Sequence, residues 1–156
     1  MTLFKQLTIA GVLAAIAGPV LAVDLQTADT VVRLMETIID ESGEEVYHGG
    51  GDVFFEADYN GHITAAGFNQ ATWSVVFDEV VTGYMATIPQ DEFDAVFRDA
   101  VAALEASALT DEQKAQGRAD MVLVIAEAQQ ARESGMPHAQ AVLPLANRLY
   151  PMFYGE

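Results

Sequence analysis

Two consecutive stretches with helical apolar spacing constrain the fold of this 156-residue chain more than any other sequence feature. In each stretch, apolar side chains recur at positions i, i+3, i+4 and i+7, which places them on one face of a helix. Asn69 is suited to cap the first helix, and Pro89 to open the second. The apolar residues are Trp73, Val76, Phe77, Val80, Tyr84 and Ile88 in the first stretch, and Phe93, Val96, Phe97, Ala100, Val101 and Leu104 in the second. We expect both faces to join one core.

A further helix is predicted between Thr110 and about Ser134. Thr110 and Gln113 have the spacing of a capping box, and Gly135 marks the end of the helix. Six consecutive apolar residues, 121–126, cannot all lie on one helix face. The pattern therefore predicts that the middle of this helix is buried on most sides, as in a central helix.

The first and last helices of the chain are predicted from apolar spacing and from proline positions. Residues 24–41 carry Val31, Met35 and Ile38 at helical spacing. The last helix begins at Pro137, and Pro144 must kink or divide it because proline has no N–H and clashes with the preceding turn. Together with the three helices above, these segments predict about five helices.

Residues 53–68 have the pattern of a β-hairpin. Asn60-Gly61 separates two runs with β propensity, and both central residues of a type I′ turn need positive φ. Strand alternation would place Val53, Phe55, Ala57, Thr64 and Ala66 on the face that packs against the helices. The sequence therefore predicts an α+β fold, predominantly α, with about five helices around one core and a single hairpin at about 53–68.

The N-terminal segment has the features of a secretory signal peptide. Lys5 precedes an apolar stretch at 7–21, and the segment closes on Val20-Leu21-Ala22, with the small residues Val20 and Ala22 at the positions that a signal peptidase reads. Fifteen residues interrupted by glycine and proline fall short of the ~20 that a membrane-spanning helix needs. We therefore expect residues 1–22 to be a signal peptide and 23–156 a single helix-rich domain. An uncleaved membrane anchor is the alternative.

Charge limits the possible partners. Residues 23–156 keep all 23 acidic residues but lose Lys5, which leaves 6 basic residues and a formal charge of −17. Such a surface repels nucleic acid and anionic lipid headgroups. The chain contains no cysteine, which rules out disulfides and thiolate chemistry. We expect a periplasmic or secreted protein that binds a protein or a cationic ligand, without nucleic acid and without stable membrane insertion after signal cleavage.

The predicted hairpin overlaps a calcium-loop pattern. Glu56, Asp58 and Asn60 fall at loop positions one, three and five, and Gly61 falls at position six. Position twelve, which needs a bidentate glutamate, is Gly67. The pattern therefore favours a turn with solvated carboxylates, and a weak Ca²⁺ site is the alternative.

A second metal hypothesis concerns a local group of histidines and carboxylates. Imidazole nitrogens and carboxylate oxygens suit Zn²⁺ or another divalent ion, and the adjacent glycines would let the chain fold back. The candidate ligands are His48, Asp52, Glu56, Asp58 and His62. No cofactor is expected otherwise. The competing interpretation is that these side chains are solvated.

No catalytic residue can be assigned from the sequence. None of the serines lies in a Gly-x-Ser-x-Gly elbow, and the Gly49–Gly51 run after His48 has no accompanying nucleophile motif. The pattern favours a non-enzymatic protein, and a metal-dependent hydrolase centred on the glycine-rich loop is the alternative.

Leu109-Thr110-Asp111-Glu112-Gln113 matches the Leu-Thr-x-x-Gln signature of a family of helical periplasmic stress chaperones. The resemblance covers five residues. It implies a helix start at this point and an extracytoplasmic compartment.

The C-terminal segment concentrates aromatic and methionine side chains. Its candidate partner-binding residues are Tyr150, Met152, Phe153 and Tyr154. Docked against the helices, they would complete the core. Exposed, they would anchor a partner, because tyrosine, methionine and phenylalanine are enriched at interface centres. Docking is the favoured interpretation, because large apolar groups seldom stay exposed.

Overall fold

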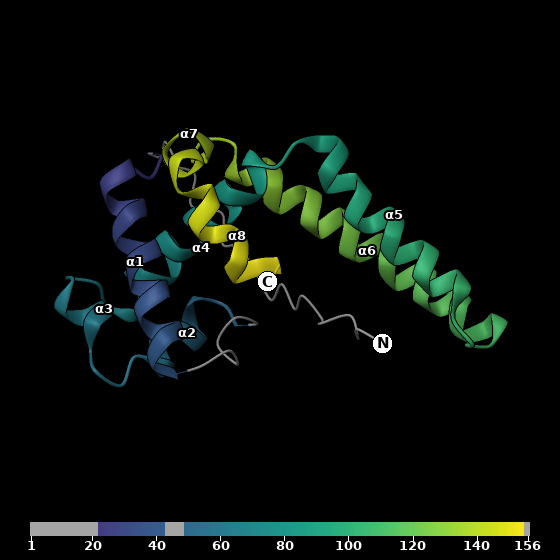
Figure 1. The fold of residues 1–156 in the computed structure, drawn as a ribbon, viewed down its shortest axis with the longest axis horizontal. Helices are drawn as coiled ribbons and strands as arrows, with labels where there is room; N and C mark the ends of the chain where they lie inside the picture. The colour runs from purple at the N-terminus through teal and green to yellow at the C-terminus, as the bar shows by residue number, and fades with distance from the viewer. Residues whose placement is uncertain (1–21, 43–48, 155–156) are drawn as a thin grey trace.

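The computed structural model describes residues 22–42 and 49–154, and every regular element in these ranges is helical (Figure 1). Residues 1–21 of the predicted signal peptide (1–22) and the predicted metal ligand His48 fall outside the described residues. The elements are α1 (Leu25–Ser42), α2 (Gly51–Ala57), α3 (His62–Ala65), α4 (Gln70–Thr87), α5 (Gln90–Ala106), α6 (Asp111–Gly135), α7 (Ala139–Val142), the 3₁₀ helix η2 (Leu143–Leu145) and α8 (Ala146–Tyr154).

Helix α4 is the central helix of the fold. It packs against α1, α2, α6, α7 and α8. Asn69 caps it as predicted: the Asn69 side chain accepts from the Thr72 backbone N–H, and the Thr72 hydroxyl accepts from the Asn69 N–H. Trp73, Phe77 and Val80 are buried along one side. The predicted helix from Asn69 to Ile88 is thus confirmed.

The core contains aromatic side chains from three segments. The Phe77 ring lies 5.2 Å from that of Phe54 on α2 and 5.8 Å from that of Trp73. Phe68, in the turn before α4, meets Trp73 edge-on with ring centroids 5.9 Å apart. The Trp73 indole Nε1–H donates to the Gly51 carbonyl over 2.7 Å, so α2 is held to α4 by a buried hydrogen bond as well as by packing.

The predicted β-hairpin is wrong, and the described ranges contain more helices than the predicted five, because this segment adds α2 and α3 and because Pro144 divides the last helix. Residues 53–68 form the end of α2, a turn and α3, and the described ranges contain no strand. Gly61 does adopt positive φ, at 72°, but it serves as the N-cap of α3. The Asp58 carboxylate accepts from the backbone N–H groups of His62 (2.8 Å) and Ile63 (2.7 Å) and so satisfies donors at the start of α3.

The residues buried by this segment explain why the helices form. Phe54 and Ile63 are buried, whereas the predicted inward residues Val53, Thr64 and Ala66 are exposed. In a helix that starts at Gly51, the backbone of Gly51 lies against α4 and Phe54 reaches the Phe77 ring one turn later. Strand propensity depends on a paired neighbour, and α4 supplies a helix-packing surface instead.

Helices α5 and α6 pair side by side and project away from the rest of the described chain as a two-helix arm (Figure 1). Arg132 fixes the base of the arm: its guanidinium donates to the carbonyls of Met85 (3.0 Å) and Ala86 (3.1 Å) at the C-terminal end of α4. It also lies over the Phe93 ring, 5.5 Å from the centroid. Arg132 therefore satisfies carbonyls that a helix end leaves without a partner.

The middle of α6 contradicts the predicted burial on most sides. Ala128 is the buried residue nearest to this segment, whereas Val122, Leu123 and Val124 are exposed. The helix itself begins and ends as predicted, with Thr110 and Gln113 forming the capping box. The apolar run therefore extends round the helix beyond the side that α5 covers.

The C-terminal segment returns to the core. Pro144 divides it as predicted, since η2 separates α7 from α8. On α8, the Arg148 guanidinium bonds the carboxylates of Asp29 (2.7 Å) and Glu36 (2.5 Å), which ties the C-terminal helix to α1. These two carboxylates raise the pKa of Arg148, with the hydrogen bonds to Glu36 as the largest cause.

Candidate functional site

The exposed side of α6 carries an apolar surface, here called the α6 patch: Ala119, Val122, Leu123 and Ala126. Ala119, Val122 and Ala126 are spaced by three and four residues, so they follow one stripe of the helix, with Leu123 beside it. Val122 is 65% exposed and Leu123 is 64% exposed. Side chains of this size are usually buried, and clusters of them on a surface are typical of interaction sites.

The opposite side of α6 explains how the patch is held. Met121 and Ile125 are half-buried and Ala128 is buried. Gly117 lets α5 approach closely, because a Cβ at this position would lie 2.9 Å from a methyl group of Leu104. One side of α6 therefore packs within the arm, against α5, and the α6 patch lies on the opposite side of the helix.

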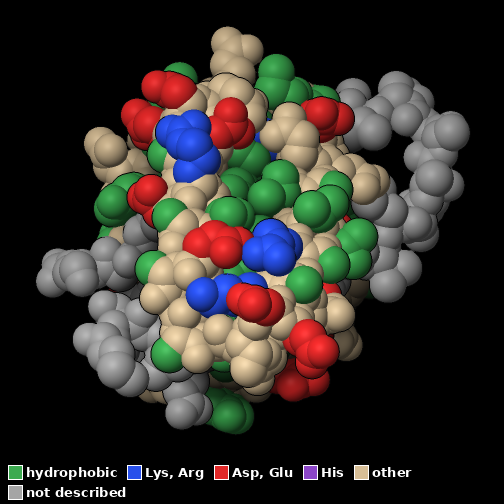
Figure 2. All heavy atoms as spheres, turned by 90° about the vertical axis from the view of Figure 1, so that its right-hand side faces the viewer, with side chains coloured by type: hydrophobic (Ala, Val, Ile, Leu, Met, Phe, Trp, Pro, Cys, Tyr) green, Lys and Arg blue, Asp and Glu red, His purple; other side chains and the backbone are tan. Residues whose placement is uncertain are grey.

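The arm is acidic around this apolar surface. Residues 90–135 contain ten acidic and four basic side chains. Three of the basic groups are engaged within the arm or at its base: Arg118 pairs with the Glu105 carboxylate (2.7 Å), Lys114 donates to the Glu105 carbonyl (2.7 Å), and Arg132 bonds α4. Figure 2 views the molecule from the arm end and shows apolar side chains between acidic and basic groups.

The predicted metal ligands of the former hairpin region are spread over α2 and α3. Asp52 and Glu56 are exposed on α2, and Asp58 caps α3 through its carboxylate. Within the described residues, no group of three or more histidine, cysteine or acidic side chains is placed to hold a metal ion. His48, a candidate ligand of the Zn²⁺ hypothesis, lies outside these residues, and both the Ca²⁺ and the Zn²⁺ hypotheses stay predictions.

His62 has a partner that the sequence analysis missed. Its Nε2 lies 3.1 Å from Glu41 Oε1 at the end of α1, and the Asn60 amide donates to the same carboxylate over 2.9 Å. Asn60 first, and His62 second, lower the pKa of Glu41. The cluster therefore joins the turn before α3 to the C-terminal end of α1.

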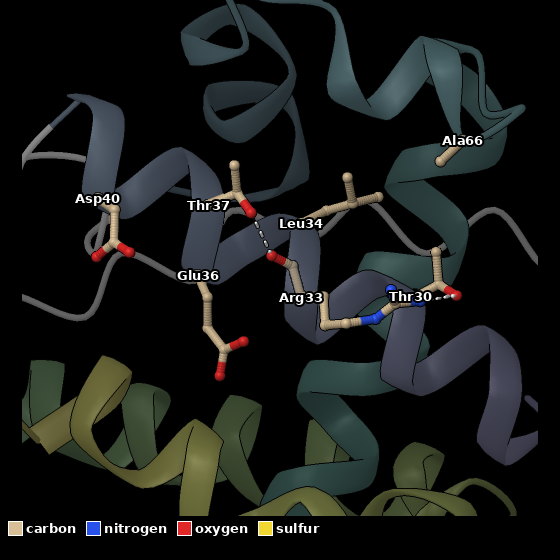
Figure 3. Close-up of a pocket in the computed structure, with 7 residues that line it drawn as sticks. All are labelled: Thr30, Arg33, Leu34, Glu36, Thr37, Asp40 and Ala66. Carbon is tan, nitrogen blue, oxygen red and sulfur yellow. Dashed lines mark hydrogen bonds between the residues drawn. The ribbon is translucent and has the colours of Figure 1, made fainter.

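A shallow depression of about 480 Å³ lies along α1 (Figure 3). Three of its polar side chains bond within α1: the Thr37 hydroxyl donates to the Arg33 carbonyl (2.9 Å), and the Arg33 guanidinium donates to the Thr30 hydroxyl (3.2 Å). The side chains drawn in Figure 3 point in different directions. The depression therefore lacks the convergent polar groups that a catalytic site needs.

The C-terminal residues divide between core and surface. Met152 is buried, and the Phe153 ring stacks on Tyr84 with centroids 5.3 Å apart. Tyr150 is exposed, and the side chain of Tyr154 lies outside the described residues. Met152 and Phe153 thus complete the core, which was the favoured interpretation of this segment.

Comparisons with protein-family models, with curated proteins and with solved structures find no match for this chain. Among the described helices, none combines the length and the apolar content needed to cross a bilayer.

The sequence analysis did not predict the two-helix arm. The six consecutive apolar residues of α6 did indicate it, because they surround more of the helix than one neighbouring helix can cover.

Proposed function

We propose that this chain is an exported, non-enzymatic protein that binds a protein partner through the α5–α6 arm. The observation that carries the proposal is the exposure of Val122 and Leu123 on a helix whose other side already packs on α5. Burying two such side chains in an interface would contribute several kcal/mol, at roughly 25 cal/mol per Å² of apolar area. The arm projects from the core, so a partner can reach the patch without rearranging the fold (Figure 1).

The charge of the arm defines the partner's chemistry. Asp120 and Glu127 are exposed on the same stretch of α6 as the patch, and the chain as a whole has a formal charge of −16. A complementary partner presents an apolar ridge flanked by lysine or arginine side chains. Such a partner is steered toward the arm at low salt, and apolar contact then holds it.

The test compares two double variants, each of which replaces one valine and one leucine of similar exposure, at different places on the surface. Val122→Ser/Leu123→Ser changes the patch, whereas Val75→Ser/Leu143→Ser changes side chains that are 58% and 60% exposed on α4 and η2. Each protein is immobilised and exposed to the extracytoplasmic fraction of the source cells, and retained proteins are quantified by mass spectrometry. We expect one partner to be depleted at least tenfold by the patch variant and retained by the control variant.

Two further measurements make the result interpretable. Retention of the partner should fall steeply between about 0.05 and 0.5 M salt, because exposed charges are screened over ~3–15 Å in this range. Both double variants should unfold within about 1 kcal/mol of the unmodified protein, since exposed substitutions usually cost under ~0.5 kcal/mol each. Equal retention by both variants, or retention that does not depend on salt, would reject the proposal.

A further inference from the structure

A buried hydrogen bond joins the start of the described chain to α7. The backbone nitrogen of Val23 donates to Nδ1 of His138 over 3.0 Å, across a sequence separation of 115 residues. Val23 is 6% exposed and His138 is 3% exposed. The bond therefore fixes Val23, two residues before the start of α1, to the helical segment that follows α6.

The donor of this bond is the first residue after the predicted signal-peptidase site. Hydrolysis of the Ala22–Val23 peptide bond by water leaves a carboxylate on Ala22 and an amine on Val23. We propose that His138 is the docking site for the α-amino group of Val23 in the processed protein, so that removal of the signal peptide creates a buried amine–imidazole pair. This inference rests on the export part of the proposed function.

The environment of His138 suits an acceptor of this kind. Burial lowers the pKa of His138 because desolvation disfavours the imidazolium. A neutral imidazole whose Nδ1 is unprotonated accepts a hydrogen bond, and a bond from an ammonium is stronger than one from a peptide N–H. Gly83 makes the close approach possible, since a Cβ there would lie 2.9 Å from the His138 Cβ.

The surroundings also leave room for the other two hydrogens of an ammonium group. A shallow depression of about 330 Å³ opens beside Val23, and Ala22, Leu25, Pro137 and Gln140 are among the residues that line it. Once Ala22 has been removed, the amine borders this depression. Water there can accept the remaining N–H bonds, so the ammonium is not left unsatisfied.

The charged side chains on the elements around the Val23–His138 pair either bond other groups or lie one helical turn away from the contact with His138. The Asp24 carboxylate accepts from the Thr27 N–H and hydroxyl, each over 2.9 Å, and Arg132 is bonded to α4. Glu133 accepts from Gln129 (3.3 Å), and Glu79 lies one helical turn before Gly83 on α4. Protonation of His138 would therefore place two cations in contact and open the pair.

Amine acylation measures the docking directly. Residues 23–156 contain a single lysine, Lys114, which is half-buried and donates from Nζ to the Glu105 carbonyl over 2.7 Å, so it serves as an internal reference that is the same in both chains. The processed chain beginning at Val23 is compared with a chain that keeps Ala22 as its first residue, in which the Val23 nitrogen is again a peptide N–H. Both are treated with an amine-reactive ester near pH 7, and the modified sites are followed by mass spectrometry.

We expect the α-amino group of Val23 to be acylated at least about tenfold more slowly, relative to Lys114, than that of the Ala22 chain, as one hydrogen bond to a charged group would give. His138→Leu in the processed chain should restore fast acylation. If that variant does not fold, the comparison between the two chain starts decides alone, because neither alters the imidazole.

Equal acylation of the two chains would overturn the docking proposal while leaving export and partner binding intact. A processed protein whose mass places its first residue elsewhere than Val23 would overturn the cleavage premise and the docking proposal with it. Neither result bears on whether the α6 patch binds a partner, so the two proposals fail separately.

Discussion

At the residue scale, the turn between α2 and α3 shows that a glycine with positive φ can belong either to a hairpin turn or to the start of a helix. Asn60-Gly61 indicates a hairpin because Gly61 tolerates positive φ, and Gly61 does adopt it. The same conformation, however, also opens a short helix when a carboxylate is present to accept its first N–H groups. Asp58 is that carboxylate. The positive φ of Gly61 was therefore predicted correctly, whereas the hairpin inferred from it was wrong.

A pH prediction follows from His138 at the same scale. Burial lowers the pKa of His138 in the folded protein below its ordinary value of 6.5, so the unfolded chain binds more protons below that pH. The free energy of unfolding should therefore decrease as the pH falls from about 7 through 6.5 and toward the folded-state pKa. Urea unfolding at half-unit pH intervals measures this slope.

The control variant is His138→Gln, whose amide oxygen can accept from Val23 but does not titrate. It should flatten the slope between pH 7 and 5. Glu79 cannot produce the same loss, because burial raises its pKa from 4.5 and such a group favours the folded state as pH falls. An unchanged slope in His138→Gln would show that another group governs the acid sensitivity.

At the element scale, local capping and apolar spacing were sufficient for most helix boundaries. Asn69 and Thr110 start α4 and α6 with complete capping boxes, and these signals lie within four residues. The side of a helix that becomes buried depends on its neighbours, which lie far away in sequence. Helix α6 therefore begins and ends as predicted but exposes Val122 and Leu123 instead of burying them.

Gly135 and Gly117 of α6 test how closely α4 and α5, respectively, approach this helix. A Cβ at Gly135 would lie 2.0 Å from the Thr82 carbonyl oxygen, and the backbone of α4 cannot move aside locally. At Gly117 the nearest atom is a methyl group of Leu104, 2.9 Å away at the flexible end of a side chain. Gly135→Ala should therefore destabilise the fold by about 3 kcal/mol or more, the upper range for overpacking.

Gly117→Ala should stay within about 1 kcal/mol of the unmodified protein, because alanine gains roughly 1 kcal/mol of helix propensity over glycine and Leu104 can rotate. Chemical denaturation of both variants, with the slope checked for two-state behaviour, gives the comparison. Similar losses at the two positions would mean that the α4–α6 contact is looser than the structure indicates.

At the scale of the whole molecule, one core holds α1, α2, α3, α4, α7, η2 and α8, and the arm stands outside it. The core cluster includes buried residues from each of these elements and none from α5 or α6, so the expectation that the apolar face of residues 93–104 joins this core is wrong. Stability is therefore concentrated around α4. The arm depends on the α5–α6 seam and on its attachment to α4, through the packing of α6 on α4 and through Arg132.

Hydrogen exchange should reveal this division. Amide groups in the outer half of the arm, about residues 100–122, should exchange through openings that cost less free energy than those of α1 and α4, because few apolar contacts are lost. Native-state exchange with mass spectrometry at increasing denaturant measures these opening free energies. Identical values for the outer arm and for α4 would indicate that the molecule unfolds as one cooperative unit.

The sequence by itself determined the helices whose signals are local: the start of α4 at Asn69, the capping box of α6 and the break at Pro144. Only the tertiary structure decided which faces are buried. Phe54 and Ile63 turn inward because α4 offers a helix-packing surface, and the α6 patch turns outward because α5 covers a single side. Capping and helical spacing act within a few residues, whereas burial depends on contacts between segments that the chain order does not specify.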